Sequence, residues 1–235
     1  MTKTLVLWDI DGTILRGGGV GRRSMEAAFR EVLAGEGPRA GPVDLGGVAF
    51  HGNTDPGIIT AGLELLGEVA RAELIEAIGE AYLRILARQV EAYSPFERLP
   101  GVLEAIDRLA EAGVHQGLGT GNLEAAAWLK VDAVGLGGRF AFGGFGSDAS
   151  DRAELLRIGR DRGAGQLGLA PGRCRVVVIG DTLRDIVAAR AIGAEVVAVA
   201  TGGEAHDVLG EARPDLLFES LAAVDLALAL SELGR

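Results

Sequence analysis

Residues 5–13 of the chain read LVLWDIDGT, an apolar run that ends in two aspartates one residue apart. The apolar part is typical of a buried strand, and the glycine that follows the aspartates indicates a turn. A charged carboxylate at the end of a buried strand is costly unless a cation or a reaction uses it. Because residues i and i+2 of a strand point the same way, we expect Asp9 and Asp11 to face one pocket. Such a pocket could hold a hard metal ion beside an attacking oxygen.

Two further strand-like runs end in polar groups. Residues 176–179 lead into Asp181 and Asp185, and residues 114–118 lead into a Gly-Thr-Gly-Asn segment that contains Thr120. In a parallel sheet the carboxyl ends of the strands meet at one edge, where ligands bind. The three strand ends therefore offer four carboxylates and one hydroxyl to a common site.

Strands alternate with helices from Pro100 to the end of the chain. The predicted helices cover 101–112, 122–135, 151–164 and 183–192, and the predicted strands cover 114–119, 175–180, 195–200 and 216–218, before a terminal helix. This alternation predicts a parallel sheet covered by helices on both faces. We expect a doubly wound α/β core made of residues 1–14 and 99–235.

Residues 15–98 carry helical patterns and no convincing parallel strand. A helix is predicted to start near Ser24 and a longer one to cover 71–92. Residues 53–56, Asn-Thr-Asp-Pro, are typical of a helix start with proline in the first turn. We expect a helical cap inserted after the first strand. The glycine run at 17–19 lacks the lysine of a P-loop, so it is predicted to be a hinge rather than a phosphate cradle.

The composition indicates the compartment in which the protein works and the classes of partner that it does not bind. It has 235 residues, 48% of them hydrophobic, and a formal net charge of -10, which argues against binding nucleic acid or a membrane surface. The single cysteine, Cys174, allows no internal disulfide and favours a reducing cytoplasm. No apolar run approaches a membrane span, and Asp9 comes too early for a signal peptide. A cytoplasmic monomer or homodimer is expected.

Taken together, these motifs resemble those of the haloacid dehalogenase-like hydrolases. Residues 8–13 are similar to the first motif of that family, Thr120 to the second, and Asp181 with Asp185 to the fourth. The resemblance implies that Asp9 attacks the phosphorus of a phosphate ester, and that Asp11 protonates the leaving oxygen and then activates water.

The resemblance also implies Mg²⁺ as the cofactor, since a hard octahedral ion prefers oxygen ligands. The implied ligands are the Asp9 carboxylate, the main-chain carbonyl of Asp11 and Asp181, with Asp185 as a ligand or directly behind one. A second role is open for Asp185, because residues 182–185 also resemble a capping box.

The resemblance further implies that the hydroxyl of Thr120 and the neighbouring Gly121 and Asn122 bind the phosphoryl group. A turn or helix-cap role for Thr120 is the alternative, but Asn122 is better placed to cap the helix that follows. His51 and Asn53 lie in the predicted cap, where a loop residue in solvent and a substrate contact are both open interpretations.

The chain departs from the family pattern at the third motif, which usually supplies a lysine. Lysine occurs only at positions 3 and 130, so Arg152, at the start of the helix 151–164, is predicted to neutralise the nucleophile and the phosphate. Arg157 lies further along that helix. Lys130 is expected to be a surface or structural residue, with little effect on turnover when replaced.

The predicted function is Mg²⁺-dependent hydrolysis of a small phosphate monoester, in the manner of phosphoglycolate phosphatase-like members of the family. A phosphosugar mutase is an alternative, because the difference lies in cap contacts. A catalytically silent binding protein on the same fold is the alternative from another class, although the complete set of aspartates disfavours it. The expected partner is a small phosphorylated metabolite.

Overall fold

The computed structural model describes residues 3–34, 43–93 and 96–234. Its centre is a six-stranded sheet in which every paired neighbour runs parallel. The strand order is β5-β4-β1-β6-β7-β8, so the first strand lies in the middle of the sheet. The strands are β1 (Lys3–Trp8), β4 (His115–Thr120), β5 (Gly143–Phe145), β6 (Cys174–Gly180), β7 (Glu195–Val199) and β8 (Leu216–Phe218).

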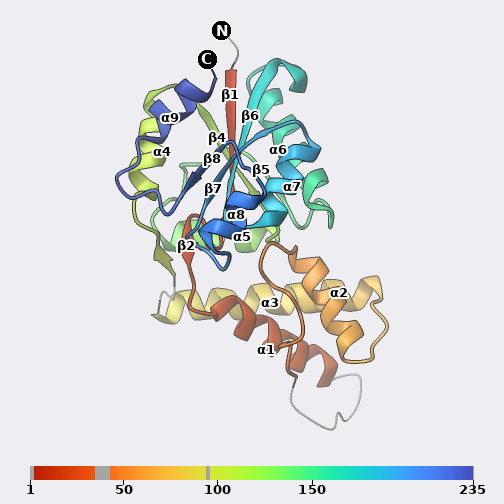
Figure 1. Ribbon diagram of the computed structural model, residues 1–235. Helices are drawn as coiled ribbons and strands as arrows, with labels where there is room; N and C mark the ends of the chain where they lie inside the picture. Colours follow the sequence, from red (N-terminus) through yellow and green to blue (C-terminus); the bar gives the residue numbers. More distant parts are fainter. Residues whose placement is uncertain (1–2, 35–42, 94–95, 235) are drawn as a thin grey trace.

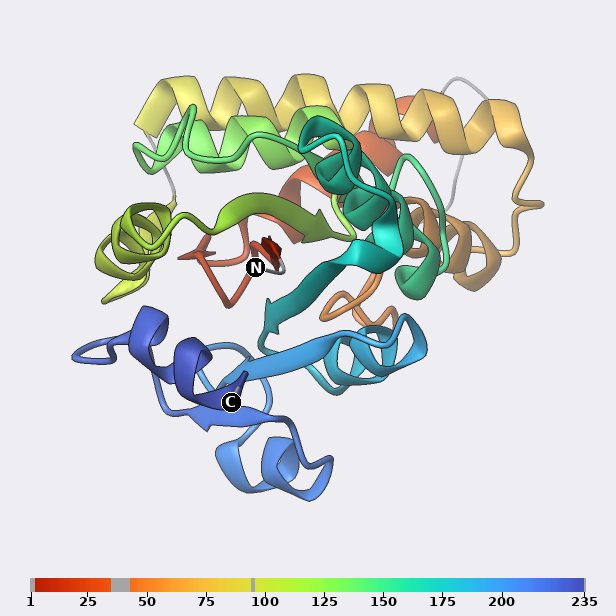
Figure 2. The same cartoon turned by 90° about the horizontal axis from the view of Figure 1, so that it is seen from above.

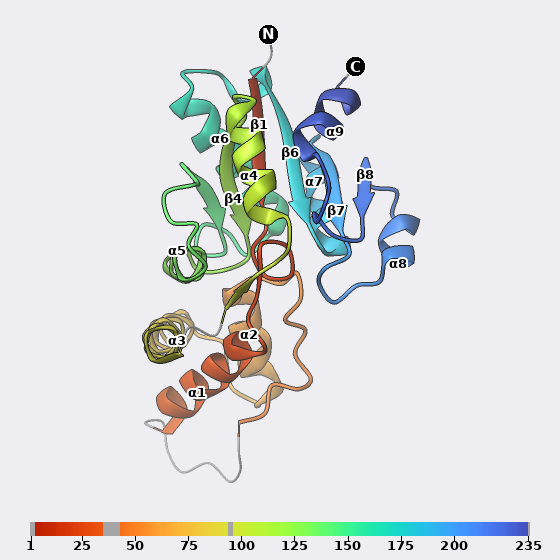
Figure 3. The same ribbon diagram turned by 90° about the vertical axis from the view of Figure 1, so that its left-hand side faces the viewer.

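Helices cover both faces of this sheet, because successive side chains of a strand point to opposite sides. Leu5 and Leu7 of β1 belong to the apolar cluster formed with α6 and α7, whereas Val6 and Trp8 belong to the cluster formed with α4, α5 and α9. Figure 3 shows α4 and α9 in front of the sheet. The helices are α4 (Val102–Glu111), α5 (Glu124–Ala133), α6 (Arg152–Gln166), α7 (Leu183–Ala191), α8 (His206–Glu211) and α9 (Leu226–Leu233), with a 3₁₀ turn, η1, at Pro171–Arg173.

Three helices form a separate layer beyond the carboxyl ends of the central strands (Figure 1). They are α1 (Val20–Ala34), α2 (Asp55–Leu65) and α3 (Ala72–Tyr93). The chain enters this layer through β2 (Leu15–Arg16) and leaves it through β3 (Glu97–Arg98), and the two short strands pair antiparallel. The predicted fold class, a doubly wound α/β core with an inserted helical cap, is confirmed.

The cap helices begin where local sequence signals place them, with one exception. Thr54 is the N-cap of α2, its hydroxyl accepts a hydrogen bond from Gly57 N at 3.2 Å, and Pro56 lies in the first turn. The first cap helix starts at Val20, one turn earlier than the prediction near Ser24. The long helix α3 packs against α1, α2 and the core helix α5, and Figure 2 shows it beside α5.

The strand β5 is not among the predicted strands, and glycine occupies two of its three positions. Glycine has a low strand propensity and hides the pattern. Here it is required by packing, since a Cβ at Gly144 would lie 1.8 Å from Leu155 O of α6. The strand is therefore held by close contact between its backbone and a helix rather than by large side chains of its own. The helix α8 was also not predicted.

Within the described residues, no helix combines the length and the apolar character that a membrane span requires.

Candidate active site

A cavity of about 420 Å³ lies where the carboxyl ends of the central strands face the cap. Its core wall contains Asp9, Asp11, Thr120 and Arg152, and the loop at 201–203 closes one side. The cap wall mixes apolar side chains, among them Met25, Phe50 and Ile58, with the charged side chains of Arg22 and Asp55. His51 and Asn53 also line the cavity, so both predicted loop residues lie within reach of a bound molecule.

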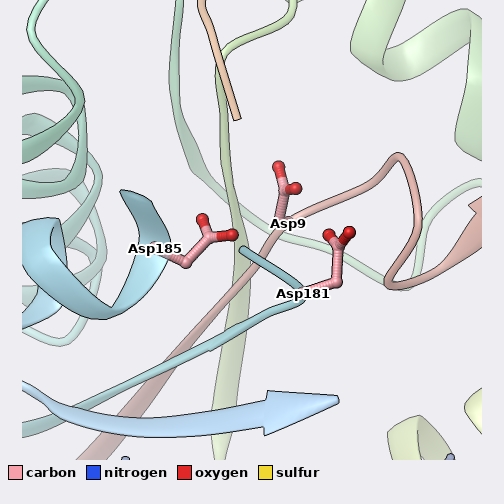
Figure 4. A group of neighbouring side chains, drawn as sticks. All are labelled: Asp9, Asp181 and Asp185. Carbon is pink, nitrogen blue, oxygen red and sulfur yellow. The ribbon is translucent and has the colours of Figure 1, made fainter. Parts of the chain in front are cut away.

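Three aspartates converge on the core side of this cavity (Figure 4). Asp9, Asp181 and Asp185 are buried, and one carboxylate oxygen of each lies within 4.8 Å of the others. Asp181 Oδ1 accepts a hydrogen bond from Thr13 Oγ1 at 3.1 Å, but its Oδ2 is buried with no hydrogen-bond donor among the described residues. A buried carboxylate oxygen without a donor is a suitable ligand for a hard divalent cation.

The backbone around Asp181 leaves room for this carboxylate only because two neighbours lack a Cβ. A Cβ at Gly202 would lie 1.6 Å from Asp181 Oδ2, and one at Gly12, whose φ is +88°, would lie 2.4 Å from it. Gly202 and Thr13 are therefore site residues that the sequence analysis did not single out. Thr13 is the last residue of the first motif, residues 8–13, whereas the only sequence signal at Gly202 is its position in a loop after a strand.

In the absence of a cation, the negative charges of the buried aspartates are costly. Burial raises the pKa of Asp9 to about 6, and it raises the pKa of Asp181 well above the usual range. The proximity of the carboxylates to one another adds to both shifts. A divalent cation would remove this penalty, so the residues present fit the implied metal.

Arg152 lies at the first position of α6 and reaches the aspartate cluster. Its Nη2 is 2.9 Å from Asp9 Oδ1, and its Nε donates to Asp185 Oδ1 at 2.8 Å. Burial opposes the positive charge, but Asp185 and Asp9 outweigh it and raise the pKa of Arg152 further. The guanidinium is thus a fixed positive charge beside Asp9. By contrast, Arg157 lies on the surface and pairs with Glu154.

Asp185 is occupied by partners of the protein itself. Its Oδ1 accepts from Arg152, and its Oδ2 accepts from Thr182 N at 3.1 Å and from Thr182 Oγ1 at 2.6 Å. Thr182 and Asp185 form a capping box at the start of α7, so the capping role left open by the sequence is present. Both oxygens of Asp185 are therefore engaged by the protein, whereas Asp181 keeps an oxygen without a donor among the described residues, and Asp185 holds Arg152 beside Asp9.

Asp11 is turned away from the three aspartates, although it lines the same cavity. The strand argument for Asp9 and Asp11 fails in detail because β1 ends at Trp8 and both residues follow in a loop. Asp11 Oδ2 accepts from Lys130 Nζ at 2.6 Å and from Asn122 Nδ2 at 2.9 Å. Burial would raise the pKa of Asp11, but the Lys130 ammonium, the hydrogen bond from Asn122 and the charge of His51 together outweigh it and lower that pKa.

The surface alternative for Lys130 and the capping role expected for Asn122 are wrong. Lys130 is not a surface residue, since its side chain is only 4% exposed. Asn122 does not cap α5, whose N-cap is Leu123, and its side chain instead contacts Asp11, Lys130 and Thr120. A sequence signal for Lys130 did exist, because it lies three and four residues after Ala127 and Ala126 on the buried face of α5.

The loop that follows β4 is also the place where core and cap meet. Thr120 is fully buried, and its Oγ1 accepts from Asn122 Nδ2 at 2.8 Å. Gly121 O accepts from Asp55 N of the cap at 2.7 Å, and a Cβ at Gly121 would lie 2.2 Å from Asn53 O. The Asp55 carboxylate accepts from Leu123 N at 2.8 Å, so a cap residue completes the start of a core helix.

Asp55→Asn is expected to stabilise the protein above pH 6. Burial raises the pKa of Asp55 from 3.8 to about 6. The stability that its proton contributes is therefore full below 3.8 and is lost as the pH rises through about 6. Asparagine keeps an oxygen for Leu123 N and carries no charge. Urea unfolding should give equal free energies for variant and wild type near pH 4 and a gain of up to about 3 kcal/mol for the variant at pH 8.

Glu73→Gln, at an exposed position of α3, is the matched control and should change little at either pH. A stability difference between Asp55→Asn and wild type that is the same at both pH values would contradict the assignment of the burial penalty to Asp55.

Comparison with known proteins identifies the family. The model of the haloacid dehalogenase-like hydrolases matches residues 3–193. A search of curated protein sequences gives no match. Among solved structures, CbbY from Rhodobacter sphaeroides in complex with phosphate has a TM-score of 0.72 and 18% identity, covering 94% of this chain and 96% of that one.

Two further structures have the same fold. A protein predicted to be a phosphoglycolate phosphatase, from Haemophilus somnus 129PT, has a TM-score of 0.67 and 17% identity over 98% of this chain and 99% of that one. A protein assigned as a β-phosphoglucomutase, from Bacteroides vulgatus, has a TM-score of 0.65 and 20% identity over 99% of this chain and 89% of that one. At these identities the likeness shows the fold, whereas the family model covers most of the chain and agrees with the geometry of the site. The chain belongs to the haloacid dehalogenase-like hydrolases.

Proposed function

We propose that the protein is a Mg²⁺-dependent phosphoric monoester hydrolase that acts on a small substrate through an aspartyl-phosphate on Asp9. The observation that carries this proposal is the position of Asp9. Its buried carboxylate lies between the guanidinium of Arg152 and the unpaired oxygen of Asp181, at the wall of a cavity that the cap covers. An anionic nucleophile and an anionic phosphate can meet only where positive charge offsets both.

The first step joins a carboxylate oxygen of Asp9 to phosphorus and breaks the bond between phosphorus and the ester oxygen. Asp11 donates the proton that the leaving oxygen takes up. In the second step a water attacks phosphorus, gives its proton to Asp11 and releases inorganic phosphate, which restores Asp9. One cation held by Asp9, Asp181 and the main-chain carbonyl of Asp11 would offset the negative charge on the nucleophile and the phosphoryl group.

The phosphoryl group is held by residues of the core in this proposal. The Thr120 hydroxyl, the loop at Gly121 and Asn122 and the Arg152 guanidinium all line the cavity on the side of Asp9. The organic part of the substrate then lies toward the cap, where Met25 and Ile58 supply apolar contacts. A cavity of about 420 Å³ suits a small metabolite. A phosphoglycolate-like substrate is the representative of this class.

Turnover is expected to require a divalent ion of the Mg²⁺ type. Hydrolysis of 4-nitrophenyl phosphate should vanish when EDTA strips the protein and return when Mg²⁺ is added, because the available ligands are all oxygens. Asp181→Ala should raise the Mg²⁺ concentration that half-saturates activity. Full activity in protein that elemental analysis shows to be free of metal would point to a metal-independent hydrolase.

The same assay separates the alternatives that share this fold. No turnover of any ester in a panel of phosphorylated metabolites, with Mg²⁺ present and the protein folded, would favour a binding protein. Conversion of a sugar phosphate into its isomer, without release of inorganic phosphate, would identify a mutase. Release of inorganic phosphate from a small monoester is the result that the proposal expects.

A further inference from the structure

Lys130 is a buried cation that the proposed reaction leaves without a role. It comes from α5, and its side chain is 4% exposed, whereas the Asp11 carboxylate beside it is 49% exposed. Burying an ammonium group costs several kcal/mol unless partners replace its water. A surface position would avoid this penalty. The chain uses arginine for nearly all of its other cations and has a lysine only here and at position 3.

The partners of Lys130 form a closed triangle. Lys130 Nζ lies 2.6 Å from Asp11 Oδ2 and 2.6 Å from Asn122 Oδ1. Asn122 Nδ2 donates to the same Asp11 oxygen at 2.9 Å and to Thr120 Oγ1 at 2.8 Å. Two donors therefore fix one oxygen of Asp11. They connect it to the predicted phosphate-binding loop.

These hydrogen bonds engage Oδ2 of Asp11 and leave its Oδ1 free to contact a substrate. Asp11 lines the cavity, and its Oδ1 receives no hydrogen bond from any residue that the structure describes. A carboxylate that rotates freely in a loop would reach the leaving oxygen only part of the time. With Oδ2 held on the protein side, Oδ1 stays presented to the cavity, and a misplacement of about 1 Å at such a group can cost about a hundredfold in rate.

A purely structural role does not explain this arrangement as well. The ammonium also lies over the Phe96 ring, 5.9 Å from the ring centre, which is a weak contact. The buried acid of the cap, Asp55, feels the charge of Lys130 but makes its hydrogen bond to Leu123 N instead. An apolar side chain of similar length would fill the same space without the penalty of a buried charge.

We propose that Lys130, together with Asn122, is a positioning residue that holds the general acid Asp11 against the leaving group of the substrate. The inference rests on the proposed function, since it needs Asp11 to act as the proton donor. The inference gives the two cationic side chains of the site different roles. Arg152 serves the nucleophile and the phosphoryl group, and Lys130 serves the acid.

The two roles predict different responses to the leaving group. Protonation matters most for an ester whose alcohol is a weak acid and least for one whose phenol leaves readily as an anion. The test compares kcat/KM for 4-nitrophenyl, phenyl and benzyl phosphate, which share one ring and differ in the acidity of the leaving group. This parameter covers the step that forms the aspartyl-phosphate and is not affected by the later hydrolysis.

Lys130→Met should lower kcat/KM about a hundredfold for benzyl phosphate and little for 4-nitrophenyl phosphate, because general-acid catalysis contributes about 10²–10⁴-fold to a step that needs it. Asp11→Asn should show the same selectivity, and Lys130→Arg should recover part of the loss. Arg152→Ala should lower all three values alike. Arg157→Ala, an exposed position, is the matched control and should change none of them.

The possible outcomes distinguish a failure of the proposed phosphatase function from a failure of the positioning role of Lys130. If the wild type hydrolyses none of the three esters with Mg²⁺, the proposed function fails. If it hydrolyses them and Lys130→Met loses all three in equal proportion or none, the positioning role is wrong. Wild-type turnover confined to 4-nitrophenyl phosphate would also contradict the role, because no positioned acid would then be serving the leaving group. Should Lys130→Met fail to fold in a thermal melt, Lys130→Gln, which keeps a hydrogen-bond donor but not the charge, replaces it, with a smaller loss of the same selectivity expected.

Discussion

Asp9→Asn is expected to abolish turnover while the protein stays folded. Asparagine nearly preserves the shape of the side chain but removes the oxygen nucleophile, so no aspartyl-phosphate can form. The loss of kcat should be about a thousandfold or more, as for other essential catalytic groups. It should appear with 4-nitrophenyl phosphate in the presence of Mg²⁺, where the wild type provides the reference rate.

The variant should also be at least as stable as the wild type. The pKa of Asp9 is raised to about 6 by its burial, with Asp185 and Asp11 adding to the effect, so a neutral side chain relieves repulsion in the protein without bound metal. Thermal unfolding without metal would show this. Mass spectrometry should show that the preparation is free of deamidation. Wild-type-like activity in such a preparation would contradict the assignment of Asp9 as the nucleophile.

Arg152→Ala is the change with the second largest expected effect. The guanidinium lies 2.9 Å from Asp9 and is held by Asp185, so its charge is fixed where the transferred phosphoryl group would be. Removing one electrostatic stabiliser from a buried site lowers kcat by about 10²–10³-fold. Steady-state kinetics with saturating Mg²⁺ would measure the loss.

Arg152→Lys should recover part of that loss, because lysine keeps the charge but cannot bridge Asp9 and Asp185 with a planar fork. Arg157→Ala is the control on the same helix, since its side chain pairs with Glu154 at the surface. The buried contact of Lys130 with Asp11 removes the earlier reason to expect that its replacement would be silent. Normal kcat in Arg152→Ala with a large loss in Arg157→Ala would show that the positive charge had been placed on the wrong residue.

The backbone arrangement of the site could be predicted from local patterns. Apolar runs at 5–8 and 176–179 have the length and composition of buried strands; the first ends directly before Asp9, and one glycine separates the second from Asp181. Parallel strands place their carboxyl ends at one edge, so Asp9 and Asp181 had to come near each other once the fold class was known. Arg152 could be placed at the same edge by its position at a helix start, after the absence of lysine in that region drew attention to it.

The contacts among side chains could not be predicted in the same way. Lys130 and Asp11 are 119 positions apart, and whether their side chains meet depends on how α5 packs and on how the loop after β1 turns. The strand rule for i and i+2 stops applying where the strand stops, and β1 ends one residue before Asp9. For this reason Asp11 turned toward Lys130 and Asn122 instead of joining the three aspartates.

By itself, the sequence determined the fold class, the edge of the sheet that carries the site and the residues at its strand ends, because strand and helix periodicity are local properties. The tertiary structure decided which cation serves which aspartate, how Asp55 of the cap completes a core helix and why residues 143–145 form a strand. Those features depend on distances between segments that are far apart in the chain. A buried charge such as that of Lys130 is stable only beside a partner of opposite charge, and a glycine-rich strand such as β5 is stable only when a helix packs against its backbone.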